Sequence, residues 1–236
     1  MAFILNIDTS LEDGVVGLSE NGSVIAWQGS ADQKEHASFL QPAIKQLLQD
    51  AGKKMQDIDA VSVAIGPGSY TGLRVGLASA KGLCYVLNKP LIAINTLEII
   101  AVKMMEELAQ LKDKGELEKI TLCPMIDARR MEVFTAQYNW EIKTIHPPTA
   151  IILEETSFDN ELNTHRIAFA GNGMPKFQQI CHHPNAIFLH KKHGISQLAE
   201  LSEKAFQAKE FADVAYIEPF YAKAFYSTHS NTANIN

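Results

Sequence analysis

Residues 64–76, which read AIGPGSYTGLRVG, place glycines and hydroxyl side chains between a strand-like stretch and an apolar helix. Glycine-rich turns at a helix N-terminus often bind phosphate, because free backbone amides and the helix dipole point at the anion. The stretch is not a P-loop, since it has no Gly-Lys-Ser/Thr, and its glycines are one residue too widely spaced for a dinucleotide fingerprint. Two interpretations stay open: a nucleotide-phosphate contact through Gly66, Gly68 and Ser69, or a plain tight turn.

Carboxylates close two similar strand-like runs in the two halves of the chain. Asp8, Thr9 and Ser10 follow ILNI, and Asp127 follows TLCPMI. Carboxylate oxygens are suited to bind Mg²⁺, which in turn binds phosphate, so Asp8, Thr9 and Ser10 join the phosphate interpretation. The alternative is that both aspartates only cap turns. The next residues, Arg129 and Arg130, either pair with Asp127 or face a partner.

A second group of candidate metal ligands lies in CHHPNAIFLHKKH, which contains Cys181, His182, His183, His190 and His193. Adjacent histidines before a Pro-Asn turn rarely converge on one ion, and the two lysines of this stretch oppose a cation. We therefore expect surface histidines rather than a metal site. No serine or cysteine triad is indicated, because Ser69 does not stand in Gly-x-Ser-x-Gly.

The elements that must position these residues alternate between strands and helices. Hydrophobic patterning predicts strands at 3–7, 14–19, 23–28, 60–65 and 90–94 and helices at 37–51, 72–87 and 96–112. ENGS, at 20–23, predicts a hairpin turn. Pro42 indicates that the first helix starts later than residue 37.

The pattern then restarts, with strands from residue 121, a second Gly-x-Gly turn at 171–173 and a last helix at 196–209. Asp8 matches Asp127 and Gly66 matches Gly171, so we expect a duplicated fold with two similar lobes. We place the lobes at 1–100 and 101–226. The polar tail at 227–236 is expected to be disordered.

Small residues recur every four positions on the helix at 72–87, where Gly72, Gly76, Ala80 and Cys84 give a nearly flat face. A flat face lets another element approach closely. Either the face packs on the chain's own sheet, or it contacts another subunit together with the helix at 37–51. The second interpretation predicts a partner interface that contains Phe39, Leu40, Ala43, Ile44, Leu47, Gly72, Arg74, Gly76, Ala80 and Leu83.

The overall composition of the chain limits the kinds of protein that it can be. The chain has 236 residues, a hydrophobic fraction of 46% and a formal net charge of −6. This acidity argues against nucleic-acid binding by the chain alone. Three scattered cysteines fit the reducing cytoplasm, and no signal peptide or membrane-spanning run is evident.

GPGSYTGLRVG, ILNIDTS and MIDARRMEVF together resemble the family of tRNA threonylcarbamoyladenosine biosynthesis proteins known as TsaB or YeaZ. The resemblance extends from Ile4 to EPFYAK at 218–223. It implies an α/β fold of the duplicated actin/Hsp70/sugar-kinase type (the ASKHA, RNase H-like class), with two lobes and mixed sheets. It also implies a role in forming threonylcarbamoyladenosine at position 37, next to the anticodon, in tRNAs that read codons starting with A.

The catalytic paralogue in that family, TsaD, binds a metal through a His-x-x-x-His pair. This sequence has Thr96 and Ile100 at those positions, with Glu98 between them. Threonine is a poor ligand and isoleucine is none, so we expect no metal site and no catalytic residue.

The resemblance therefore predicts a non-catalytic partner of TsaD, with the ATPase TsaE as a further partner and tRNA contacted only through the complex. A homodimer is expected when TsaD is absent. No cofactor is expected to be required, although weak ATP or ADP and Mg²⁺ binding fits the fold. The alternative is a stand-alone nucleotide-dependent phosphotransferase that uses Asp8 and the glycine loop.

Overall fold

Two five-stranded sheets form the framework of the molecule, which is described here from a computed structural model covering residues 2–30, 36–110 and 117–222. The strand orders are β3-β2-β1-β4-β5 and β8-β7-β6-β9-β10. In each sheet the first three strands are antiparallel and the last two run parallel to the central one. The two orders are identical when counted from the start of each half, which confirms the duplicated α/β fold with mixed sheets.

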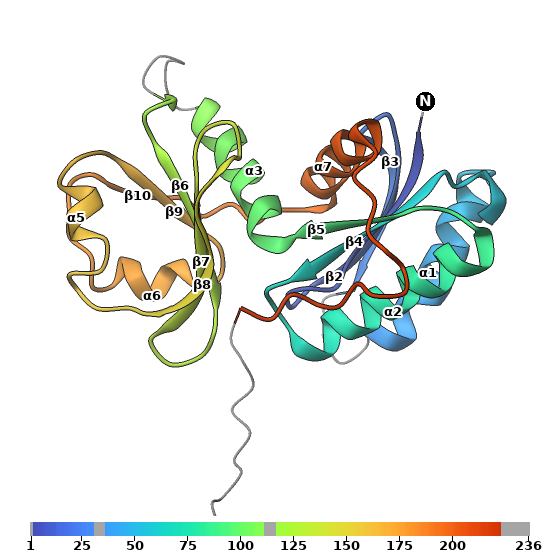
Figure 1. Ribbon diagram of the computed structural model, residues 1–236, viewed down its shortest axis with the longest axis horizontal. Helices are drawn as coiled ribbons and strands as arrows, with labels where there is room; N and C mark the ends of the chain where they lie inside the picture. The colour runs from blue at the N-terminus through green and yellow to red at the C-terminus, as the bar shows by residue number, and fades with distance from the viewer. Residues whose placement is uncertain (1, 31–35, 111–116, 223–236) are drawn as a thin grey trace, which may run out of the picture.

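The first sheet contains β1 (Phe3–Asp8), β2 (Gly14–Glu20), β3 (Ser23–Ser30), β4 (Ala60–Gly66) and β5 (Leu91–Asn95). Every residue of β1 is buried, because side chains alternate between two covered faces. Phe3, Leu5 and Ile7 pack toward α1 (His36–Asp50) and α2 (Tyr70–Leu87). Ala2 and Ile4 pack toward α7 (Ile195–Ala208) on the opposite face. Figure 1 shows this lobe on the right.

The second sheet contains β6 (Thr121–Asp127), β7 (Glu132–Tyr138), β8 (Thr144–Ile152), β9 (Ile167–Ala170) and β10 (Ala186–Phe188). One face is covered by α3 (Thr96–Ala109). Phe169 and Phe177 lie in the core on the other face, which carries α5 (Asp159–Leu162) and α6 (Met174–Gln178).

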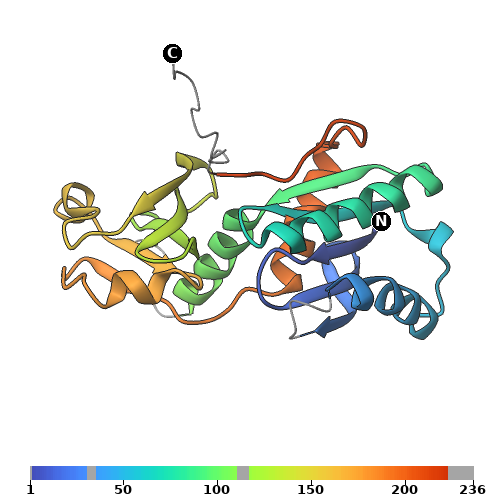
Figure 2. The same cartoon turned by 90° about the horizontal axis from the view of Figure 1, so that it is seen from below.

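Two helices each pack on the lobe opposite to the one that contains the preceding strand. α3 follows β5 of the first sheet but packs on β6 of the second, whereas α7 follows β10 of the second sheet but packs on β1 of the first. Figure 2 shows the two lobes side by side, with the chain before α7 crossing between them. The division at residue 100 stays a prediction, and the tail at 227–236 lies outside the described residues.

Most predicted elements agree with the structure to within a few residues. Asn21 and Gly22 both have positive φ, as the predicted hairpin turn requires. The expectation about Pro42 was wrong, because α1 begins at His36 and contains Pro42 in its second turn. Pro42 is exposed and removes only one backbone donor, while buried Leu40 and Ile44 on the inner face hold the helix in place.

Residues 211–222 run from α7 back across the first lobe (Figure 1). Ala212 forms an antiparallel bridge with Leu91, and the amide of Phe220 donates to the carbonyl of Ile65 at 2.8 Å. The ammonium of Lys81 on α2 donates to the carbonyl of Ile217 at 3.1 Å. No helix among the described residues is long and apolar enough to cross a bilayer.

Candidate functional site

A cavity of about 270 Å³ lies between the lobes. Its apolar wall includes Val15 from the first lobe and Ile100, Met174 and Leu189 from the second. Acidic, basic and histidine side chains gather at the end of β1 and on the chain that leads to α7. These are Asp8, Glu12, Asp13, His190, Lys191, Lys192 and His193.

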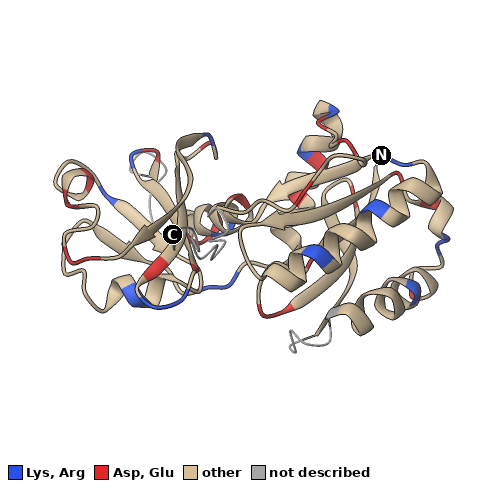
Figure 3. Cartoon of the chain, turned by 60° about the horizontal axis from the view of Figure 1, so that its bottom comes forward, with Lys and Arg blue, Asp and Glu red and all other residues tan. Residues whose placement is uncertain are grey.

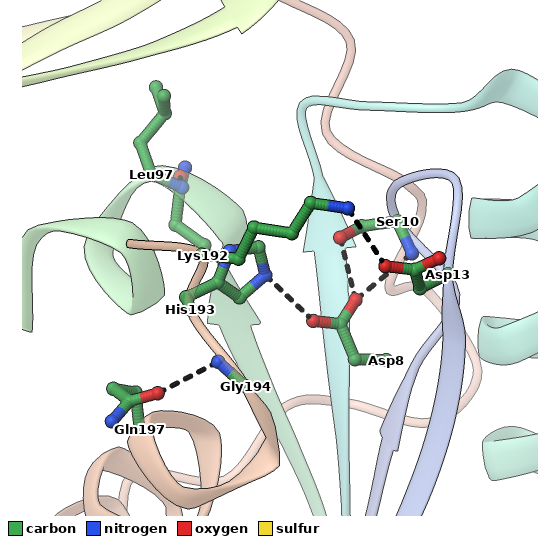
Figure 4. A network of polar contacts seen from close by, with 9 residues as sticks. Asp8, Ser10, Asp13, Leu97, Lys192, His193, Gly194 and Gln197 are labelled. Carbon is green, nitrogen blue, oxygen red and sulfur yellow. Dashed lines mark hydrogen bonds and ion pairs between the residues drawn. The ribbon is translucent and has the colours of Figure 1, made fainter. Parts of the chain in front are cut away.

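Asp8 is the buried acid of this cavity (Figure 4). Its Oδ1 accepts hydrogen bonds from the amide of Ser10 at 3.0 Å and from the hydroxyl of Ser10 at 2.6 Å. Its Oδ2 lies 3.2 Å from Nε2 of His193, which precedes α7. Burial acts to raise the pKa of Asp8, but the hydrogen bonds and charge of His193 and Ser10 prevail and hold that pKa below its ordinary value.

The role of His193 was not predicted from the sequence. A surface histidine was expected, but only 12% of the His193 side chain is exposed, and it pairs with Asp8. Residues 8 and 193 lie far apart in sequence, and no local pattern signals their contact. Nearby, Lys192 forms a longer, exposed ion pair with Asp13 at 3.3 Å (Figure 4).

The glycine loop packs against the turn that follows Asp8. The amide of Ser69 donates to the carbonyl of Ser10 at 2.7 Å, and the hydroxyl of Thr9 donates to the carbonyl of Gly72 at 2.7 Å. A Cβ on Gly68 would lie 2.1 Å from the carbonyl oxygen of Ser10, and one on Gly72 would lie 2.0 Å from that of Thr9. The glycines are therefore required for close backbone contact within this chain.

Of the residues predicted to contact phosphate, Asp8 alone lines the cavity. Thr9 and Ser10 are fully buried beneath the glycine loop, and the side chain of Ser69 accepts the amide of Gly72 as the N-cap of α2. Gly66 ends β4 with a φ of 112°, next to the carbonyl of Phe220. Phosphate binding by this group stays a prediction.

The small-residue face of α2 is covered by the chain's own lobe. Gly72, Gly76 and Ala80 are buried, and a Cβ on Gly76 would lie 2.3 Å from the hydroxyl oxygen of Thr9. The interpretation in which this face packs on its own sheet therefore describes the structure. Seven of the ten predicted interface residues are buried inside the chain, namely Leu40, Ala43, Ile44, Leu47, Gly72, Gly76 and Ala80.

The accessible members of that prediction are Phe39, Arg74 and Leu83. Arg74 and Leu83 lie on α2, which also carries two strongly exposed residues, Tyr85 at 84% and Val86 at 80%. The guanidinium of Arg74 lies 3.9 Å from the ring centre of Tyr70 and donates to the hydroxyl of Tyr221 at 3.1 Å. The hydrogen bond to Tyr221 raises the pKa of Arg74.

Thr96 and Ile100 lie one helical turn apart at the start of α3. Both are buried, and Ile100 lines the cavity. Among the residues that the structure describes, the Thr96 hydroxyl has no hydrogen-bond partner. Burial, reinforced by the charge of Glu210, raises the pKa of Glu98. Within residues 2–30, 36–110 and 117–222, no three His, Cys, Asp or Glu side chains form a group that could hold a metal ion.

Asp127 ends β6 as Asp8 ends β1, but it is exposed and lies outside the cavity lining. Its ion-pair partner is Lys176 at 2.6 Å, and neither Arg129 nor Arg130 forms a salt bridge with it. The amide of Arg129 donates to Oδ1 of Asp127 at 2.5 Å. Burial acts to raise the pKa of Asp127, but Lys176 and Arg129 outweigh it and lower that pKa.

The duplicated strand order, the two crossing helices and the cavity between the lobes define a protein of the actin/Hsp70/sugar-kinase class. Residues 30–231 match the family model of TsaD, tRNA N6-adenosine threonylcarbamoyltransferase. The chain belongs to this family, and it is similar to curated proteins named TsaB.

Two curated relatives carry the name tRNA threonylcarbamoyladenosine biosynthesis protein TsaB. The Bacillus subtilis protein is 35% identical over 138 residues, which are 58% of this chain and 56% of that protein. The Escherichia coli protein is 32% identical over 135 residues, 57% of this chain and 54% of that protein. The matched region thus spans just over half the length of each relative.

A solved structure of YeaZ from Pseudomonas aeruginosa superposes with a TM-score of 0.76. It is 23% identical, and the match covers 94% of this chain and 100% of that one. At this identity the likeness establishes the two-lobed fold, which therefore extends over nearly the whole chain.

Proposed function

We propose that this chain takes part in forming threonylcarbamoyladenosine in tRNA as a non-catalytic partner of a TsaD-type transferase. The proposal is carried by Thr96 and Ile100, which the family resemblance aligns with the paralogue's two histidine ligands. Both side chains are buried, the hydroxyl of Thr96 has no partner in the described part of the chain, and neither residue type supplies a good metal ligand. The names of the B. subtilis and E. coli relatives support the same pathway.

The partner surface in this proposal is the outer face of α2 with the accessible part of α1. Tyr85, Val86 and the stacked pair of Arg74 and Tyr70 give this face exposed aromatic, aliphatic and arginine side chains. Aromatic residues and arginine are enriched in protein interfaces. The same surface would serve a homodimer in the absence of the transferase, and TsaE would join the heterodimer as a further subunit.

The proposed role requires no cofactor. Weak ATP or ADP binding in the cavity is compatible with this role but is not needed for it. The residues present fit Mg²⁺ poorly. Both oxygens of Asp8 already accept hydrogen bonds, and the neighbouring His193, Lys191 and Lys192 disfavour a cation. The proposed location is cytoplasmic, in line with three cysteines that are all free and buried.

Size-exclusion chromatography with light scattering tests the partner surface. The chain is run alone and with the TsaD-type transferase of the same organism, as wild type, Ala78→Arg and Ala208→Arg. Both alanines are exposed, but Ala78 lies on α2 and Ala208 on α7. We expect a heterodimer that Ala78→Arg weakens at least tenfold and Ala208→Arg leaves unchanged.

Transfer activity tests the non-catalytic role. The chain alone is expected to transfer no threonylcarbamoyl group to tRNA, and addition of the transferase is expected to restore the reaction. Transfer by the chain alone would overturn the proposal. Tight ATP binding that Asp8→Ala abolishes would favour the phosphotransferase instead.

A further inference from the structure

The turn between β6 and β7 contains two of the chain's four arginines, Arg129 and Arg130. Both have left-handed backbone conformations, with φ of 72° and 47°. Gly and Asn adopt this conformation more readily than arginine, because a larger side chain crowds the backbone there. Asn21 and Gly22, in the two-residue turn between β2 and β3, are such residues. The turn therefore has two arginines where the fold alone would favour other residues.

The backbone of this turn is held by a set of hydrogen bonds. Oδ1 of Asn172 accepts the amide of Asp127 at 2.9 Å, and the amide of Glu132 donates to the carbonyl of Arg129 at 3.0 Å. Lys176 donates to Asp127 and, at 3.3 Å, to the carbonyl of Glu132. None of these contacts uses a guanidinium, so the hydrogen bonds that hold the turn leave both arginine side chains accessible.

The two guanidinium groups are available for an external anion. Arg129 and Arg130 are exposed, and in the part of the chain that the structure describes neither guanidinium forms a salt bridge or hydrogen bond. Arg129 contributes its charge to Asp127, but Lys176 already neutralises that acid. Around this turn the cations Arg129, Arg130 and Lys176 outnumber the acids Asp127 and Glu132, so the turn is locally positive in a chain with a net charge of −6. Figure 3 shows how Lys and Arg are distributed over the two lobes.

We propose that Arg129 and Arg130 bind the phosphodiester backbone of RNA. Free phosphate is bound in concave sites where several donors converge, but this turn projects outward and lies outside the cavity lining. A polymer instead gains affinity by adding separate phosphate contacts, to which arginines contribute strongly. The proposal rests on the proposed function only in naming tRNA as the RNA.

Binding of fluorescently labelled tRNA transcript, measured by anisotropy across a range of salt concentrations, tests this proposal. The double variant Arg129→Asn/Arg130→Gly preserves the turn and removes both charges. The control, Lys204→Gln/Lys209→Gly, also removes two positive charges and also replaces a left-handed residue, since Lys209 has a φ of 58°. Its two sites are exposed on α7 and at its C-terminal end.

We expect the arginine variant to bind tRNA roughly tenfold more weakly at low salt. The slope of log affinity against log salt should become shallower by about one to two units. The control should match wild type. Titrations are made on the chain alone and on its complex with the transferase, and melting curves verify that each variant is folded.

Equal affinity and slope for wild type and the arginine variant would overturn the proposal. So would an equal loss in the control, which would indicate a general charge effect, or loss of ADP and inorganic phosphate binding with tRNA affinity unchanged. Failure of the chain and transferase to co-elute would count against the proposed function instead, and the titration of the chain alone would still decide the role of the turn.

Discussion

The turns that follow Asp8 and Asp127 occupy equivalent places in the two halves of the fold, but they have opposite surroundings. Asp8 is buried and bound by Ser10 and His193, and the adjacent Thr9 contacts the glycine loop. Asp127 is exposed and bound by Lys176, and the adjacent arginines face outward. The turn in the first half is a structural junction between segments, and the turn in the second half is part of the surface.

Position in the topology therefore does not determine the role of a residue. The first turn joins β1, α2 and the chain before α7, so any change there affects three segments at once. The second turn touches mainly β7 and α6 of its own lobe. Four predictions test this difference, in order of decreasing effect.

The largest effect is expected for Gly72→Ala, because the new Cβ would lie 2.0 Å from the carbonyl oxygen of Thr9. Backbone atoms on both sides cannot yield easily, so we expect destabilisation of about 3 kcal/mol, at the upper end of the overpacking range. Denaturant unfolding measures this. The matched control is Gly82→Ala on the same helix, where the Cβ meets nothing within 4 Å and should stabilise by about 0.5–1 kcal/mol. Equal effects at the two glycines would contradict the close contact.

The two aspartates should differ in the same direction. Asp8→Asn removes the charge from a buried group that accepts hydrogen bonds from Ser10 and pairs with His193, and we expect a loss of about 2 kcal/mol. Asp127→Asn weakens a partly exposed ion pair, for which less than about 1 kcal/mol is expected. Unfolding free energies of the two variants near neutral pH make the comparison. A larger loss for Asp127→Asn would reverse the assignment of roles.

The contribution of Asp8 should also depend on pH. Its pKa is lower in the folded chain than its ordinary value of 3.8, so the unfolded state binds the proton more tightly. The stabilisation is therefore complete above the ordinary value and is lost as the pH falls through the lower native pKa. The unfolding free energies of wild type and Asp8→Asn should accordingly converge in acid. A difference that stays constant through this range would show that Asp8 acts without its charge.

The sequence predicted the framework better than the contacts across it. Local patterns such as the alternation in β1, the Asn21-Gly22 turn and the repeat of Gly66 at Gly171 indicated the strands and the duplication. The pairing of Asp8 with His193 depends on α7 crossing to the first lobe, which no local pattern encodes. The flat face of α2 was visible in the sequence, but only tertiary packing decides that Thr9, rather than another subunit, covers it.

The smallest effect is expected in the second turn, and it has the opposite sign. Arg129→Asn/Arg130→Gly replaces two residues in left-handed conformations with residues that adopt them readily, so unfolding should become harder by about 1 kcal/mol. The two arginines supply no hydrogen bond from a guanidinium within the described residues, which leaves little stability to lose. Urea unfolding is measured for this variant and for Lys209→Gly, which replaces another residue in a left-handed conformation. The comparison separates an effect specific to the turn from the stabilisation that glycine brings at any left-handed position. A stabilised variant would mean that the arginines are retained at a cost to the fold, as a surface with a binding role requires. A destabilised variant would mean that the arginines hold the turn together. Both turns would then be structural, and they would differ only in how much stability they contribute.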